Sequence, residues 1–130
     1  AQFFDSTNSN WNPNTKYNQF FLRAQQDWLN DKLNADGFVM LNDAYDSLGL
    51  EKTSAGAVVG WVKGALGRDG YIDFGIWDAE DEDRYFDFMM GEEDAILLDF
   101  NVDGNVYDKI DEIRAAKNSN KTHRWTRSSR

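Results

Sequence analysis

The sequence contains no cysteine, one proline and one histidine. Without cysteine, the chain cannot form disulfides, supply a thiolate nucleophile or bind zinc through sulfur. No segment approaches the roughly eighteen uninterrupted apolar residues that a membrane span requires. The N-terminus lacks a basic region followed by an apolar stretch, which is the pattern of a secretory signal. The composition therefore predicts a soluble protein that is not exported.

The sequence also has few groups that are suited to catalysis. Its only histidine, His123, lies in a basic stretch where no neighbour indicates a fixed catalytic partner. Carboxylates are abundant, but no spacing among the 23 acids singles out a pair of the kind that glycosidases use. We therefore expect no enzyme activity, no catalytic residue, no metal site and no cofactor. A carboxylate-based hydrolase is the alternative.

Aromatic surface and negative charge are what the sequence has in quantity. Nine Phe, five Tyr and five Trp among 130 residues are enough to build the core of one domain. Residues 117–130 hold five basic residues and no acid, which leaves nine basic residues and 23 acids in residues 1–116. The sequence thus predicts a single acidic domain over 1–116 and a basic C-terminal tail over 117–130. An acidic body is poorly suited to nucleic acid, because binding to phosphates depends on Lys and Arg.

The first long element that the sequence predicts is a helix over residues 15–35. The sequence NPN at 12–14 signals a turn before it, and Gly37 ends the helical periodicity. Apolar side chains recur at helical spacing through this segment, namely Tyr17, Phe20, Phe21, Ala24, Trp28 and Leu33. Such a stripe is far more often core packing than a partner-binding surface, so we assign it to the core.

Shorter elements are predicted after this helix. Residues 38–41 favour a strand, and Asn42 is a candidate N-cap for a short helix that ends at Gly49. Thr53 or Ser54 is a candidate cap for a further helical turn.

Two more strands are predicted at 58–62 and 71–77, joined by a glycine-rich loop. This loop lacks the Gly-Lys-Ser/Thr ending and the strand-loop-helix setting of a phosphate-binding loop. We therefore predict no phosphate site there.

Residues 96–111 open like a calcium-binding loop, with Asp99, Asn101 and Asp103 at alternate positions. Such a loop needs a bidentate carboxylate at its twelfth position, because two further oxygens there complete the coordination shell. Counted from Asp99, the twelfth residue is Ile110, and the residues before Asp99 are an apolar β-like run instead of a helix. The calcium interpretation is therefore the weaker one.

The same segment fits a β-hairpin better. A two-residue turn at Asp103-Gly104 would place Asp99 opposite Asp108, and directly opposed like charges are unfavourable. A three-residue loop with Gly104 as a left-handed bulge instead gathers five apolar side chains on one face. We predict a bulged hairpin at about 96–110, with a C-terminal helix after it. The fold class is α+β, with a small antiparallel sheet packed against the N-terminal amphipathic helix and shorter helices.

Two segments are candidates for contact with partners. The acidic and aromatic stretch 78–94 is either a solvated excursion or a partner-binding loop. Its candidate contact residues are Asp78, Glu80, Asp81, Glu82, Asp83, Tyr85, Phe86 and Phe88. The basic tail is too polar to order itself, so it is expected to dock on the acidic body or on an external partner. Its candidate contact residues are Arg124, Trp125, Arg127 and Arg130.

Five stretches over about residues 17–110 resemble a known family. In chain order they are FLRAQQDWLNDKL, VMLNDAYDSLGL, TSAGAVVGW, YIDFG and LLDFNVDGNVYDKI. The most specific parts are Leu41-Asn42 with Leu48-Gly49, Gly56 with Gly60-Trp61, and Leu98 to Gly104. These stretches resemble the soluble C-terminal domain of a domain-of-unknown-function family found in bacteriophages and Firmicutes. The resemblance implies a phage or prophage origin and an α+β domain, and it implies no catalytic residue. Longer members carry membrane-like segments that this chain lacks, so we expect no membrane role.

These features favour a non-catalytic phage or prophage accessory protein that acts by protein–protein interaction through an acidic, aromatic-containing surface. The partner is expected to be a host or phage protein, met in the host cell cytoplasm or in the virion. Two alternatives remain within the interaction class. One is an acidic inhibitor of a host nucleic-acid-binding defence protein, and the other is a structural component of the virion.

Overall fold

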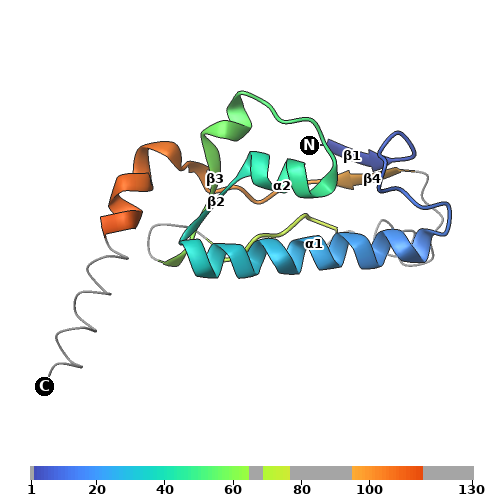
Figure 1. Ribbon diagram of the computed structural model, residues 1–130, viewed down its shortest axis with the longest axis horizontal. Coiled ribbons are helices and arrows are strands. Elements are labelled where there is room, and N and C mark those ends of the chain that lie inside the picture. Colours follow the sequence, from blue (N-terminus) through green and yellow to red (C-terminus); the bar gives the residue numbers. More distant parts are fainter. Residues whose placement is uncertain (1, 65–68, 77–94, 116–130) are drawn as a thin grey trace, which may run out of the picture.

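The computed structural model describes residues 2–64, 69–76 and 95–115 (Figure 1). The helices are α1 (Thr15–Asp36) and α2 (Leu41–Leu48), with 3-10 helices at Ala55–Ala57 and Tyr107–Lys109. Residues 110–115 are also helical. The strands are β1 (Gln2–Asp5), β2 (Phe38–Met40), β3 (Val59–Val62), β4 (Ala95–Leu98) and β5 (Gly104–Asn105). This architecture confirms the predicted α+β class.

Within these residues the strands form two small antiparallel sheets. One sheet pairs β1 with β4, and Phe4 lies opposite Ile96. The other has the order β2-β3-β5, and Val39 lies opposite Trp61. A Cβ at Gly60 would collide with the backbone carbonyl of Val39, so glycine is what allows β2 and β3 to approach at this point.

The predicted hairpin at 96–110 is wrong, because its two arms belong to different sheets. β4 pairs with β1, whereas β5 pairs with β3 and places Gly104 opposite Gly60. Gly104 does have a positive φ of 115°, as the bulge required. The segment between β4 and β5 therefore crosses from one sheet to the other instead of turning back on itself.

Helix α1 begins and ends where the local signals predicted. The side chain of Asn14 accepts a hydrogen bond from the backbone N–H of Lys16. At the other end, Gly37 has a left-handed φ of 87° and donates its N–H to the carbonyl of Leu33 at 2.9 Å. At 1.5 Å per residue the 22-residue helix is about 33 Å long. It runs along one long side of the molecule, and the other described elements lie on one side of it in this view (Figure 1).

The predicted N-cap of α2 is wrong. The helix begins directly after β2, and Asp43 accepts the backbone N–H of Met40 at 3.0 Å. Asn42 lies inside the first turn, and its side chain instead bonds both the N–H and the carbonyl of Thr53 at 2.9 Å. Asn42 thus fastens the segment that follows α2, and Gly49 ends that helix with a φ of 74°.

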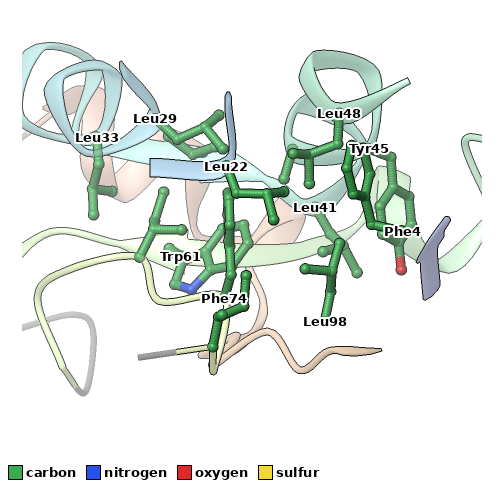
Figure 2. Packing of buried hydrophobic residues seen from close by; sticks show 14 of the residues in the cluster. Phe4, Leu22, Leu29, Leu33, Leu41, Tyr45, Leu48, Trp61, Phe74 and Leu98 are labelled. Carbon is green, nitrogen blue, oxygen red and sulfur yellow. The ribbon is translucent and has the colours of Figure 1, made fainter. Parts of the chain in front are cut away.

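The main core lies between α1, α2 and the strands (Figure 2). Its members include Phe4, Leu22, Leu29, Leu33, Leu41, Tyr45, Leu48, Trp61, Phe74 and Leu98. Phe100 packs against this cluster, and its ring meets those of Tyr45, Trp61 and Phe74 edge to face at centroid distances of 5.7, 6.3 and 5.5 Å. Trp61 is 1% exposed, so it lies fully within the core.

The strand predicted at 71–77 does not form over residues 71–76, the part that the structure describes. The apolar side chains at alternate positions of this segment are nevertheless buried, namely Ile72, Phe74 and Ile76. Two of its backbone N–H groups bond to side chains of α1 where strand partners were expected. Asn30 accepts the N–H of Ile72 at 2.7 Å, and Gln26 accepts the N–H of Phe74 at 3.0 Å. These bonds attach the segment to one edge of α1.

Candidate interaction surface

The face of α1 that points away from the core is aromatic. Tyr17 is 58% exposed, Phe20 is 73% exposed and Trp28 is 52% exposed, and Ala24 between them is also exposed. Spacings of three and four residues place these positions on one side of a helix. We call Tyr17, Phe20, Ala24 and Trp28 the outer stripe.

The prediction that these four residues belong to the core is therefore wrong. The buried residues of α1 are Asn18, Leu22, Leu29 and Leu33. Of the apolar residues assigned to the core, Leu33 is buried and Phe21 stacks on Phe4 at a centroid distance of 5.6 Å. Helix α1 carries apolar residues on two faces, and hydrophobic periodicity alone favoured the one with the larger rings.

The inner face of α1 includes a buried polar residue, so hydrophobic periodicity did not identify that face. Asn18 is fully buried, where a periodicity argument places an apolar side chain. Its amide donates to the carbonyl of Asn12 at 2.9 Å, and its carbonyl oxygen accepts the N–H of Asn12 at 2.8 Å. The side chain thus holds the turn before α1 and leaves no polar group unsatisfied.

The outer stripe has the size of an interaction patch. A Phe, Tyr or Trp side chain offers roughly 150–250 Å² of surface, so the exposed fractions correspond to roughly 300–450 Å² of aromatic surface. Monomeric proteins seldom expose contiguous apolar patches of more than a few hundred Å², and such patches often serve in binding. Exposed aromatic rings at this density are also typical of interface centres.

Charged residues border the outer stripe. Asp27 and Asp31 are exposed on the same helix. Near its C-terminal end, the ammonium of Lys32 lies 2.8 Å from the carboxylate of Asp36. The hydrogen bond to Asp36 raises the pKa of Lys32 above its ordinary value. An aromatic centre with a charged rim is the usual anatomy of a protein–protein contact.

Two residues of the calcium-like sequence, Asn101 and Asp103, form hydrogen bonds that stabilise the fold. The side-chain oxygen of Asn101 accepts the indole N–H of Trp61 at 2.8 Å and the backbone N–H of Asp73 at 2.7 Å. A carboxylate oxygen of Asp103 accepts the backbone N–H of Val62 at 2.7 Å. These oxygens hold the crossing between the two sheets against β3. Across the described ranges, no three side chains of His, Cys, Asp or Glu gather in a way that could hold a metal ion.

An open pocket of about 270 Å³ lies near the C-terminal end of the described residues. It is lined by Tyr107, Ile110, Asp111 and Arg114. One acid, one base, a tyrosine and an isoleucine indicate no particular ligand. The pocket therefore ranks below the outer stripe as a functional surface.

The contact residues predicted from the sequence fall outside the described ranges. They are Asp78, Glu80, Asp81, Glu82, Asp83, Tyr85, Phe86 and Phe88, together with Arg124, Trp125, Arg127 and Arg130 of the tail. Hydrophobic periodicity had found the members of the outer stripe but had assigned them to the core. In the parts of the chain that the structure describes, no helix has the length and apolar character that crossing a membrane requires.

Comparison with curated proteins and with solved structures finds no match. A protein-family model does match, and it covers residues 1–110. The match includes α1, α2 and all five described strands. It is described as "Family of unknown function (DUF6353)". The resemblance to a family of unknown function is thereby confirmed, and the chain belongs to the DUF6353 family.

Proposed function

We propose that this chain is a non-catalytic accessory protein of a bacteriophage or prophage, and that it binds a host or phage protein through the outer stripe of α1. Its site of action is the host cell cytoplasm or the virion. The observation that carries the proposal is the exposure of Tyr17, Phe20 and Trp28 on one face of a long helix that the core holds in place.

The scaffold beneath the outer stripe supports this function. Three leucines on the opposite face of α1 are at most 1% exposed, so the helix is fixed in the core along its length. Gln26 accepts the backbone N–H of Phe74 at 3.0 Å, and Asn30 accepts the backbone N–H of Ile72 at 2.7 Å. Rings presented on such a rigid helix lose little conformational freedom when a partner binds.

The charge distribution favours a protein partner. Residues 1–116 carry 23 acids against nine basic residues, which disfavours a phosphate backbone as ligand. Exposed aromatic rings with acids beside them instead match an apolar protein surface with a polar or basic rim. The acidic segment 78–88 remains a second candidate for contact with a partner.

The outer stripe can be tested by replacing its rings without weakening the helix. In a triple variant with Tyr17→Gln, Phe20→Gln and Trp28→Gln, glutamine retains good helix propensity. Tagged wild-type protein is expected to capture a partner from phage-producing cells, and the triple variant is expected to lose it while it remains folded with a cooperative unfolding transition. Tyr107→Gln is the matched control, because Tyr107 is 62% exposed on the 3-10 helix near the C-terminal end of the described chain. Capture that survives the triple variant would assign the contact to another surface and contradict the proposal.

A further inference from the structure

The exposed face of α1 is symmetric about Ala24. Phe20 lies four residues before Ala24 and Trp28 lies four residues after it. Tyr17 lies seven residues before Ala24 and Asp31 lies seven residues after it, and both are exposed. Offsets of four and seven residues correspond to one and two helical turns, so all five residues share one face.

We infer that the outer stripe pairs with the outer stripe of a second copy of the chain, with the two α1 helices antiparallel about a two-fold axis at Ala24. This rests on the proposed function, because it names the partner of the same surface. A two-fold contact is isologous, so each residue before Ala24 faces the residue at the equal offset after it in the other copy.

The pairs that result are complementary. Phe20 faces Trp28 of the partner subunit twice, which gives one aromatic contact on each side of the axis. Tyr17 faces Asp31 of the partner subunit twice, and a phenol hydroxyl donates well to a carboxylate. Alanine at the axis leaves room for the flanking rings, and the helices lie within the usual interaxial range of about 8–10 Å.

A parallel pairing lacks this complementarity. It would set Asp31 against Asp31 and Asp27 against Asp27, and like charges directly opposed are unfavourable. The antiparallel arrangement avoids both of these contacts. The order of residues along the face therefore favours one relative direction of the helices.

The outer stripe is small for the interface of a stable dimer. Two outer stripes bury roughly 600–900 Å² of aromatic surface, which is below the total of about 1,600 Å² for a standard stable interface. The dimer is thus weak, with a dissociation constant in the micromolar range or above. Each copy carries a net charge of −9, so the copies repel one another and added salt strengthens the pairing. A basic partner on the same surface would show the opposite dependence on salt.

Sedimentation equilibrium of the full chain tests the pairing. Between about 5 and 500 µM, the mass is expected to rise from one chain toward two, and to rise further in high salt. Ala24→Glu brings two negative charges together at the axis and is expected to give a monomer at every concentration. Ala57→Glu is the matched control, since it adds the same charge at an exposed alanine outside α1 and leaves the dimer intact.

Cross-linking reports the direction of the helices, because the natural chain has no cysteine. Under mild oxidation, Ala24→Cys is expected to form a disulfide-linked dimer, and Ala57→Cys is not. A mixture of Tyr17→Cys and Asp31→Cys chains is expected to link more readily than Tyr17→Cys alone. Faster linking of Tyr17→Cys to itself would overturn the antiparallel arrangement.

A chain that stays monomeric at the highest concentration and salt overturns the self-pairing, as does a dimer that persists in Ala24→Glu. Loss of a different captured protein in the triple glutamine variant would then still uphold the proposed function, with that protein as the partner in place of a second copy. If the triple variant also retains every captured protein, both proposals fail.

Discussion

The two long faces of α1 are both apolar, but they are built from different side chains. The inner face presents Leu22, Leu29 and Leu33 to the core, whereas the outer face presents aromatic rings to solvent. Amide side chains mark the inner side, where Asn18 and Asn30 bond to neighbouring backbone. A polar residue on a helix is therefore no sign of a solvent face when its hydrogen-bonding groups match those of an adjacent chain segment.

The largest effect is expected in the core that the inner face packs against. Trp61→Ala removes a ring that is 1% exposed and breaks the hydrogen bond from its indole N–H to Asn101. We expect a loss of about 3–5 kcal/mol in the free energy of unfolding, measured by urea denaturation. If stability were unchanged and partner binding lost, Trp61 would be a contact residue. The binding surface would then include β3 and not only the outer face of α1.

Two adjacent residues give the most direct test of the comparison. Leu29→Ala on the inner face is expected to cost about 2–5 kcal/mol, because the side chain is fully buried. Trp28→Ala on the outer face is expected to cost about 1 kcal/mol, because half of the surface of this residue is already exposed. Urea denaturation of both variants measures the difference. Equal losses would show that the outer stripe also supports the fold.

The amide edge of the inner face should give an intermediate effect. Asn30→Ala leaves the N–H of Ile72 without its side-chain acceptor, and an unsatisfied backbone donor of this kind costs about 1–3 kcal/mol. Asn34→Ala is the control, since Asn34 is exposed on the same helix and should cost less than about 0.5 kcal/mol. Denaturation curves that coincide for the two variants would show that the bond to Ile72 has no net effect.

The smallest effect is expected at the charged rim. The hydrogen bond to Asp36 raises the pKa of Lys32, so its contribution to stability is present below the ordinary pKa of lysine and is lost as pH rises through the raised value. Asp36→Asn should lower the pKa of Lys32 toward its ordinary value, as followed by NMR titration of the lysine side chain. At neutral pH the variant should lose about 0.3–0.5 kcal/mol, the usual contribution of an exposed pair four residues apart on a helix. An unchanged pKa would show that the pair does not persist in solution.

Several features of the fold that depend on residues close together in the sequence were predicted correctly. The bounds of α1 follow from Asn14 and Gly37, which act within a few residues of themselves. The strands over 38–40 and 59–62 follow from short apolar runs that lie close together in the sequence. Pairings between distant segments could not be predicted in this way. The register argument for 96–110 compared that segment only with itself, whereas the partner of β4 is β1 at the other end of the described chain.

The most specific sequence motifs turned out to serve the fold. Asn42 fastens the segment after α2, Gly60 allows β2 and β3 to approach, and Asn101 accepts from Trp61 and Asp73. The calcium interpretation of residues 99–103 was the weaker one in the sequence, and the side-chain oxygens of Asn101 and Asp103 accept hydrogen bonds from the core and the backbone instead. The outer stripe carried no motif, and only the three-dimensional arrangement separates it from a core stripe.

The pairing of β1 with β4 has a consequence for the order of folding. Gln2 pairs with Leu98, so within the described residues β1 pairs with a strand that is made much later than itself. Contacts this far apart along the chain are slow to form, because the loop between them must close before any contact is gained. Phe4 enters the core from β1, whereas α1, α2 and β2 follow one another directly in the sequence. We therefore expect closure of the β1–β4 sheet to be a late step of folding, because a nascent chain that ends before residue 95 lacks the strand that pairs with β1.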